Sequence, residues 1–396
     1  MTESQKNLIS LLNLECGGQI PENMDFKAVL NEAFKQSVLL MVYDKLNETN
    51  APFLESAPKL TELVYSLINK NTRANKAQKE LVDLLENEGF EYVILKGEAS
   101  ARYYPNPSLR SLGDVDFLIK PKDKNDIDEL LKQNGYTSSL EDHICHVVYK
   151  KGKKHLEMHF EVAGIPNGEK GDRVREFLKE TVDRPIIREN DYGGFYAPAH
   201  RNHAVILLLH MQHHMLSEGI GLRHLLDWGY FVNETAQLPF WEESVNPFLK
   251  EIGLFTYACV MTKTCSIFFG TVCPNWAKNT PDDVCEGIME DILSGGNFGK
   301  KDSVRKASGL MVSNRGKDGT KHKKSYYLLK TLTASVHETH PVTQKHKILF
   351  PVFFVYKAAR HVVLIALGKR ISFSKSIPQA TKRKQLYDKL HIFEVE

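Results

Sequence analysis

The segment that most constrains the fold is residues 113–119, GDVDFLI, because it sets two aspartates into the start of an apolar run. In a β-strand, successive side chains point to opposite faces of the sheet. The apolar residues would therefore face a core, while Asp114 and Asp116 would lie together on the other face. Two carboxylates on one face repel each other unless positive charge lies between them. The segment predicts a strand that is apolar on one face and binds a cation on the other.

The periodicity of apolar residues changes twice along the chain. Residues 1–90 carry apolar residues three and four positions apart, which is typical of amphipathic helices. Between residues 92 and 162 short β-rich runs alternate with helical segments in the order β-α-β-α-β-β, and the last two runs predict a hairpin with a tight turn at Lys151-Gly152. From about Ala199 the chain is helical again. The order predicts an α+β fold in which helices pack against a small mixed sheet.

These changes divide the chain into four predicted regions. We expect an N-terminal helical region at 1–88, a mixed α/β core at 89–195, a helical domain at 196–299 and a basic helical region at 300–396. The last region holds 21 Lys and Arg against six Asp and Glu, a net charge of +15, whereas the whole chain carries +3. Such asymmetry indicates either an RNA or another anionic partner, or simply a solvated helical face.

Composition limits the class of protein. With 42% apolar and 26% charged residues, the chain is an ordinary globular one. Its six cysteines are scattered, with no CxxC pair and no signal peptide before them, so we expect unpaired thiols and a cytoplasmic protein. The most apolar segment, residues 348–367, is interrupted by charged residues. It predicts a buried helix, with an interfacial helix as the alternative, and no transmembrane segment.

A third acidic residue is expected from the predicted hairpin. In the run HLEMHFEV, Glu157, His159 and Glu161 alternate with apolar residues and share one face. Either Glu157 or Glu161 could join the two aspartates. Three carboxylates from neighbouring strands suit a pair of Mg²⁺ or Mn²⁺ ions, which can clamp the attacking and leaving oxygens of a phosphoryl displacement.

Several short motifs together resemble a known superfamily. Leu95-Lys96-Gly97, the segment YPNP at 104–107, RSLGDVDFL at 110–118 and LEMH at 156–159 resemble nucleotidyltransferases typified by DNA polymerase β and kanamycin nucleotidyltransferase. More narrowly, they resemble a bacterial family of uncharacterised nucleotidyltransferases, over roughly residues 60 to 300. The resemblance implies transfer of a nucleotidyl group from a nucleoside triphosphate to an acceptor, with release of pyrophosphate.

The resemblance also implies roles for individual residues. Asp114, Asp116 and Glu157 would be catalytic and would bind Mg²⁺ or Mn²⁺, and Glu157 could also deprotonate the acceptor. The residues expected to contact the nucleotide are Lys96, Gly97, Arg110, His159, His210 and His214. One departure concerns the turn after the first strand, where the superfamily usually has Gly-Ser but this chain has Gly97-Glu98. Lys96 and Arg110 could supply compensating positive charge.

A histidine-rich helix is the second candidate site. His210 and His214 in HMQHH lie four residues apart on one helical face, and His213 lies three residues after His210. They could simply hydrogen-bond in the core, contact the nucleotide or acceptor, or bind zinc with His224 or Asp227 from the next helix. Asp227 could instead pair with Arg223, four residues before it.

Other interpretations remain open at this point. The loop GGNFGKK at 295–301 resembles a phosphate loop only loosely, and a glycine stop after a helix is the simpler interpretation. The acceptor could be an RNA end, a protein side chain or a small molecule. The chain could also be an inactive nucleotide-binding or nucleic-acid-binding protein of the same fold, or a zinc hydrolase built on the histidine helix.

Overall fold

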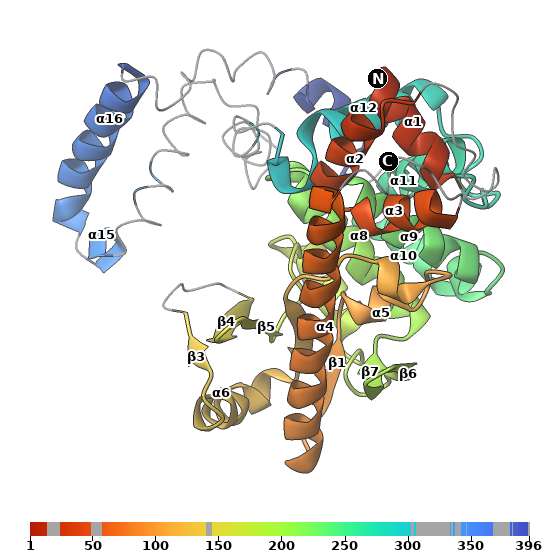
Figure 1. Ribbon diagram of the computed structural model, residues 1–396. Helices are drawn as coiled ribbons and strands as arrows, with labels where there is room; N and C mark the ends of the chain where they lie inside the picture. The colour runs from red at the N-terminus through yellow and green to blue at the C-terminus, as the bar shows by residue number, and fades with distance from the viewer. Residues whose placement is uncertain are drawn as a thin grey trace.

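The computed structural model describes residues 1–13, 24–48, 58–139, 145–301, 342–345, 347–366 and 383–394, together with residues 305, 333, 336 and 381. Most of the basic region at 300–396 therefore lies outside the described residues, and so does the expectation that it forms a surface for RNA. The rest forms a helical body above a small sheet, as Figure 1 shows, and the predicted α+β fold is confirmed.

The sheet holds five strands in the order β1-β2-β5-β4-β3. Their bounds are β1 Tyr92–Ile94, β2 Val115–Ile119, β3 Thr137–Ser138, β4 His146–Lys151 and β5 Lys154–His159. Strand β2 runs antiparallel to β1 and parallel to β5, and the other neighbours are antiparallel. The predicted hairpin is confirmed as β4 and β5, with Gly152 in its turn at φ 59°. The short strand β3 was not predicted.

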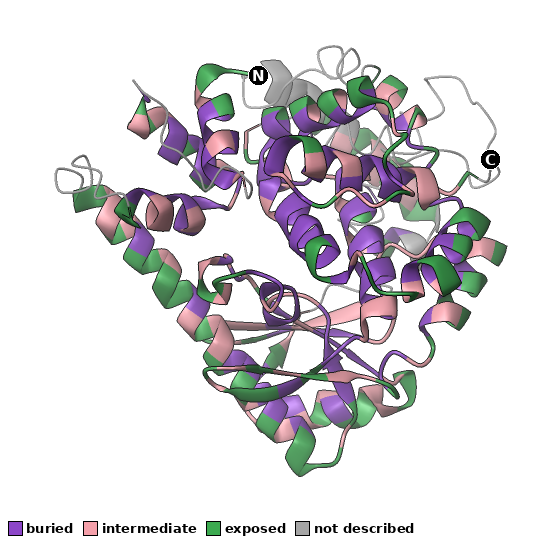
Figure 2. Ribbon diagram, turned by 90° about the vertical axis from the view of Figure 1, so that its right-hand side faces the viewer, coloured by how far each residue is buried: buried purple, intermediate pink, exposed green. Residues whose placement is uncertain are grey.

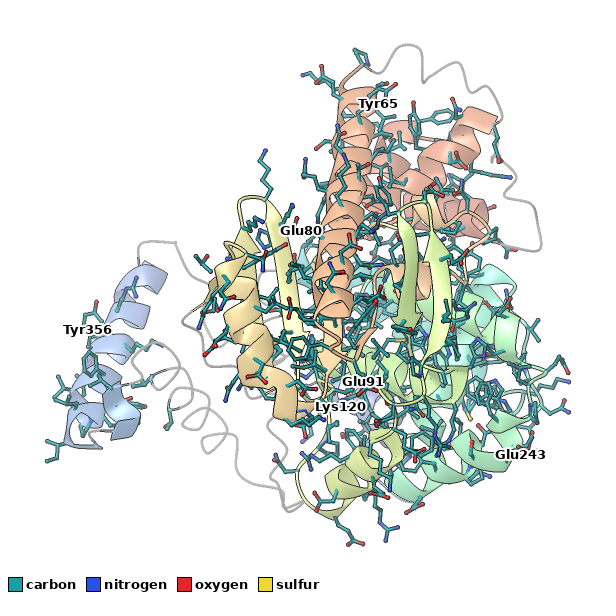
Figure 3. The ribbon with its side chains drawn as sticks, turned by 90° about the horizontal axis from the view of Figure 1, so that it is seen from below. Tyr65, Glu80, Glu91, Lys120, Glu243 and Tyr356 are labelled. Carbon is teal, nitrogen blue, oxygen red and sulfur yellow. The ribbon has the colours of Figure 1, made fainter. Side chains whose placement is uncertain are left out.

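The inner face of the sheet packs against two helices. Helix α4 (Pro58–Asn87) and helix α6 (Lys124–Gln133) contribute buried leucines to the core that holds Phe117 and Met158. Glu80 of α4 accepts hydrogen bonds from Lys151 and Lys154 at the two sides of the β4–β5 turn, which ties the hairpin to the helix. In Figure 3 Glu80 lies midway along α4, beside the hairpin. This packing fixes the direction in which the polar face of β2 and β5 points.

A second hairpin was missed by the sequence interpretation. Strands β6 (Ile186–Asn190) and β7 (Gly193–Ala197) pair with each other, and Phe195 and Ala197 join the core of the sheet. Tyr196 of β7 meets Tyr92 of β1 edge to face, with ring centroids 5.6 Å apart. The segment lacks a long apolar run, because only alternate residues of β7 are buried, and its pattern was therefore weak.

The remaining helices form the larger body. Their bounds are α1 Glu3–Leu12, α2 Phe26–Lys35, α3 Leu39–Glu48, α5 Glu98–Ala101, α7 Glu169–Leu178, α8 His200–Leu216, α9 Leu222–Thr235, α10 Asn246–Ile252, α11 Phe255–Phe269 and α12 Asp282–Gly295. Short 3₁₀ or π turns are η2 Pro107–Leu109, η3 Pro121–Asp123, η4 Trp241–Val245 and η5 Asn297–Gly299. Buried residues of α1, α2 and α3 share one hydrophobic core with α8, α9, α11 and α12. Figure 2 shows this core as buried residues concentrated in the helical body and in the strands.

The apolar segment at 348–367 forms helix α16 (Phe350–Ala366), after α15 (Val342–Lys345) and η6 (Lys347–Leu349). Its described residues Val352 and Val355 are each 65% exposed, so the prediction of a buried helix is wrong for them. The reason is that the described elements packed against α16 are its sequence neighbours α15 and η6, which lie with it apart from the body in Figure 1.

Among the described residues, no single helix is long and apolar enough to cross a bilayer. The bent pair Trp241–Ile252 and Phe255–Phe269 meets the length and composition criteria together. Side chains of this pair, such as Trp241 and Tyr257, are buried in the protein core.

Candidate active site

Three polar side chains converge where β2 and β5 lie side by side. In this parallel pair Asp116 lies opposite Glu157, and Leu118 lies opposite His159. Their position follows from alternation, because Phe117 and Met158 point into the core on the other face. One ligand atom from each of Asp116, Glu157 and His159 lies within 4.8 Å of the other two. The sheet register thus assembles two carboxylates and an imidazole from two strands.

The carboxylate of Asp116, which is 13% exposed, is held by two cations. Lys96 Nζ lies 2.7 Å from Asp116 Oδ1, and His159 Nε2 lies 3.1 Å from the same oxygen. Burial raises the pKa of Asp116, but the charges of Lys96 and His159 outweigh it and hold that pKa well below its ordinary value. The positive charge that the sequence required beside Asp116 is therefore supplied by the chain itself.

Asp114 occupies a different environment. It precedes β2 in a bend, its side chain is 47% exposed, and His155 Nδ1 lies 3.8 Å from its Oδ1. Burial, followed by repulsion from Glu157, raises the pKa of the Asp114 carboxyl. Asp114 and Glu157 are therefore close enough to oppose each other's charge, and added positive charge between them would relieve that repulsion.

The imidazole of His159 connects both carboxylates. Its Nε2 also lies 3.6 Å from Glu157 Oε2. Burial opposes its charged form, but hydrogen bonds with Asp116, Cys145 and Glu157 raise the pKa of His159 to about 10. The carboxylates of Asp116 and Glu157 suit Mg²⁺ or Mn²⁺, whereas protonated His159 has no lone pair on Nε2 for a metal and would have to lose its proton before it could join them. The residues present therefore fit the divalent metal expected from the sequence.

Lys96 and Gly97 form the turn that the sequence singled out. The backbone N–H of Leu95 donates to Asp116 O, at 2.9 Å, and so aligns the turn with β2. Gly97 has φ 61° and ψ −114°, a conformation open mainly to glycine. Glu98, the departure from the superfamily pattern, is buried and accepts hydrogen bonds from Arg102 and Asn190. Its carboxylate therefore serves the fold around α5.

The three acids line one cavity of about 430 Å³. The predicted site residues that line it are Lys96, Gly97, Arg110, Asp114, Asp116, Glu157, His210 and His214. His159 lies behind them, bonded to Asp116. A larger surface hollow beside α7, of about 660 Å³, is lined by residues such as Arg173 and Glu251 and contains none of the predicted site residues. The chemistry-bearing groups therefore gather in the smaller cavity.

The cavity wall also carries cations that the sequence did not single out for this site. Lys70 comes from the polar face of α4, Arg223 from the first turn of α9, and Lys300 from the segment after η5. The guanidinium of Arg223 donates to Ser111 O at 3.0 Å, which holds it beside the segment leading to β2. With Lys96 these residues bring positive charge to the cavity that the acids line. Charge counting alone could not place them, since they lie in separate parts of the chain.

Arg110 lines the cavity, and its guanidinium is bound to a buried carboxylate. Its Nε and one terminal nitrogen each donate to Asp227 at 2.7 Å, and Tyr104 donates to the same carboxylate at 2.7 Å. Arg110 and Asp227 are both buried. The expected pairing of Asp227 with Arg223 is therefore wrong, because the fold brings Arg110 to it instead. A carboxylate with three donors is also a poor zinc ligand, since three of its roughly four lone-pair sites are occupied.

The histidine-rich helix borders the cavity. The rings of His210 and His214 lie 4.5 Å apart, the ring of His224 lies 5.5 Å from His210, and His213 is exposed outside the cavity lining. Burial, with Lys96 nearby, lowers the pKa of His210 and His214 well below its ordinary value. Among the described residues the groups close enough to share a metal ion contain His159 rather than this cluster. Neutral imidazoles facing the cavity can still hydrogen-bond to a ligand.

The alternative third acid, Glu161, lies elsewhere. It follows β5 and forms an ion pair with Arg175 of α7. It does not line the cavity, whereas Glu157 does. The geometry thus separates the two glutamates that the sequence left open.

The loop after α12 begins with Gly296, the glycine that ends the helix. Gly296 has φ 68°, and its N–H donates to Ile292 O at 3.0 Å, so the glycine-stop interpretation is confirmed. The following residues Asn297, Phe298 and Lys300 nevertheless line the cavity. A segment that ends one helix thus also completes the wall of the site.

None of the five cysteines in the described part of the chain is in a disulfide.

A family model described as an uncharacterised nucleotidyltransferase matches residues 22–270. No curated protein and no solved structure matches the chain. The matched region includes both sheet strands that carry the acids and the histidine-rich helix α8. Because the match spans more than half of the chain and joins the Lys96-Gly97 turn to Asp114, Asp116 and Glu157, this protein belongs to the uncharacterised nucleotidyltransferase family.

Proposed function

We propose that this protein transfers a nucleoside monophosphate from a nucleoside triphosphate to an acceptor hydroxyl and releases pyrophosphate. The observation that carries the proposal is the register of β2 and β5, which sets Asp116 opposite Glu157 at the edge of a cavity that also holds Asp114. Acidic residues gathered beside a cationic wall fit a polyanionic substrate that arrives with divalent metal.

Asp116, Glu157 and Asp114 would hold the Mg²⁺ or Mn²⁺. A bound divalent ion neutralises phosphate charge and stabilises the oxygens of an in-line displacement. Lys96, whose Nζ lies between Asp116 Oδ1 at 2.7 Å and His210 Nδ1 at 3.5 Å, would bind the triphosphate beside the metal ligands. The family to which the chain belongs supports the transferase class.

The reaction forms one bond and breaks one. An acceptor oxygen attacks the α-phosphorus, and the bond from that phosphorus to the bridging oxygen of the β-phosphate breaks, so that pyrophosphate leaves. Glu157 accepts the proton of the attacking hydroxyl, in keeping with its place at the cavity edge. Positioning and charge neutralisation supply most of the rate enhancement in such displacements.

The acceptor belongs to one of three classes: an RNA end, a protein side chain or a small molecule. The basic composition of residues 300–396 favours an anionic acceptor. We place the reaction in the cytoplasm, in keeping with the free cysteines of the described residues. In the proposed division of the chain, residues 89–195 carry the acids, residues 1–88 and 196–299 enclose the cavity, and residues 300–396 supply the acceptor surface.

A second candidate function is nucleotide binding without transfer. It is favoured by the ion pair between Lys96 and Asp116, which neutralises a carboxylate that the metal would otherwise need. An inactive protein could keep this pair permanently and use the cavity for binding alone. Binding measurements give the same result for the two functions, and only a measurement of turnover separates them.

The experiment that separates them compares the wild type with an Asp114→Asn, Asp116→Asn double variant. Each protein receives Mg²⁺, one α-labelled nucleoside triphosphate at a time, and cell extract, total RNA or the protein itself as acceptor. We expect label on an acceptor with the wild type and at least a hundredfold less with the variant. Nucleotide binding without label transfer in every combination would favour the binding protein.

A further inference from the structure

The loop that closes the cavity presents an aromatic ring from a strained backbone. Phe298 has φ 53° and ψ 41°, a left-handed conformation that is unusual for a bulky residue. The ring is partly exposed and lines the cavity. The loop lies outside residues 22–270, the part of the chain that the family model matches.

A second strained residue faces this loop. Ser37, between α2 and α3, has φ 60° and also lines the cavity. Asn297 Nδ2 donates to Ser37 Oγ at 2.8 Å, which joins two segments that are 260 residues apart in sequence. The other two described non-glycine residues with positive φ, His391 and Phe393, are near the C-terminus. Backbone strain persists only where surrounding contacts fix it, and it concentrates at ligand clamps.

The neighbours of Phe298 hold its ring in place. His214 and His224 meet it edge to face, with ring centroids 4.8 and 5.3 Å away. The guanidinium of Arg223 lies 5.9 Å from the centre of the ring. On the same wall the Lys300 ammonium lies 5.6 Å from the centre of the Phe34 ring. The wall therefore combines aromatic surface with positive charge, as sites for nucleotides do.

Two buried polar atoms beside the ring lack hydrogen-bond partners among the described residues. They are Asn297 Oδ1 and His224 Nε2. Because His224 Nδ1 accepts from the Gly221 N–H, the neutral ring carries its proton on Nε2 and offers a donor there. An acceptor and a donor are thus buried next to Phe298, and a buried polar group without a partner costs free energy. A ligand with both kinds of group on one edge would satisfy them.

We propose that Phe298 is the stacking platform for the base of the nucleoside triphosphate, with Asn297 and His224 bonding the edge of that base. This rests on the proposed function and specifies its substrate. The base lies at the η5 end of the cavity, and the triphosphate extends from it toward Lys96 and the acids. Every nucleobase has a π face and an edge bearing donors and acceptors, whereas a bare polyphosphate has neither. The platform therefore selects nucleotides over inorganic polyphosphate.

The test measures dissociation constants, with Mg²⁺ present, for ATP, GTP, CTP, UTP and inorganic tripolyphosphate. The proteins are the wild type, Phe298→Leu, Phe298→Tyr and Tyr65→Leu. Tyr65 is the matched control, because it is a 62% exposed aromatic residue on α4 outside the cavity lining, as Figure 3 shows near one end of that helix. Thermal unfolding of each variant verifies that it is folded.

We expect Phe298→Leu to weaken the tightest-binding nucleotide about tenfold or more and to leave tripolyphosphate unchanged, because stacking on an aromatic ring is lost. Phe298→Tyr and Tyr65→Leu should bind like the wild type. Unchanged nucleotide affinity in Phe298→Leu, or an equal loss for tripolyphosphate, would overturn the platform and leave the proposed function standing. Wild type that binds no triphosphate at all would overturn both.

Discussion

Asp116 and Glu157 lie directly opposite each other on parallel neighbouring strands, although 40 residues separate them in sequence. The same register sets Phe117 opposite Met158 in the core behind them. A slip of one residue would turn either acid into the core and expose an apolar side chain. The hydrophobic packing of the sheet therefore fixes the geometry of the site.

The two aspartates should differ in what they do for stability. Asp116→Asn leaves Lys96 and His159 without their shared carboxylate, so we expect the free energy of unfolding to fall by about 3 kcal/mol in metal-free protein. Asp114→Asn removes a half-exposed charge that repels Glu157, and it should change stability by less than about 1 kcal/mol. Urea unfolding measures the change in the free energy of unfolding for both variants. Equal losses would show that Asp116 does not hold the two cations.

Glu157 and Glu161 form a matched pair for testing metal binding. The unfolding temperature of the wild type should rise on addition of Mg²⁺ or Mn²⁺. At a metal concentration one hundred times the dissociation constant, the free energy of unfolding should increase by about 2.7 kcal/mol. Glu157→Gln should lose this shift because it removes a carboxylate beside Asp116. Glu161→Gln breaks only the pair with Arg175 and should keep it. A metal response lost equally in both variants would contradict the assignment of Glu157.

The Arg110–Asp227 pair should behave as a structural unit. Arg110→Met leaves a buried carboxylate with Tyr104 alone, and we expect a cost of about 3 to 5 kcal/mol. Asp227→Leu should cost a similar amount. The double variant should recover at least half of the summed loss, because neither charge is then left buried. Urea unfolding of the four proteins gives the coupling, and simply additive losses would show that the two side chains act independently.

Acid should destabilise the fold through His203, a buried residue of α8 bonded to Tyr103. Burial, with His200 and Arg188 nearby, lowers the pKa of His203 from 6.5 to about 3. Below pH 6.5 the unfolded chain binds a proton that the folded chain does not, so stability falls as the pH drops from 6.5 toward 3. Relative to His203→Gln, the wild type should lose about 1 kcal/mol between pH 7.0 and 5.5. Urea unfolding at each pH measures the free energy of unfolding of both proteins, and the same pH dependence in the wild type and in His203→Gln would contradict this.

Much of the fold and part of the site follow from local patterns. The alternation in residues 113–119 and 156–159 predicts which side chains share a face, and the helix stop at Gly296 is visible in the sequence because glycine tolerates positive φ. These features depend on neighbouring residues alone. They were sufficient to bring Asp114, Asp116 and Glu157 together as a hypothesis.

Other features depend on how distant elements pack. The pairing of Arg110 with Asp227 spans 117 residues, and nothing near Asp227 distinguishes that partner from Arg223. Nothing in the local sequence distinguishes Lys70 from the other lysines on the polar face of α4. Only the packing of that helix brings it to the cavity. The place of Phe298 in the cavity lining was missed for the same reason, whereas the local hairpin β6–β7 was missed because its apolar pattern is weak. Single-sequence periodicity carries no information about such long-range contacts.

The central claim is that the α-phosphorus is the atom attacked, and two labels test it directly. Wild-type protein with Mg²⁺, the best-binding nucleoside triphosphate and its acceptor is given α-label in one reaction and γ-label in another. The account predicts α-label on the acceptor and γ-label in released pyrophosphate, with both products lost in the Asp114→Asn, Asp116→Asn variant. Transfer of γ-label to the acceptor, or no transfer of either label despite tight binding, would contradict it.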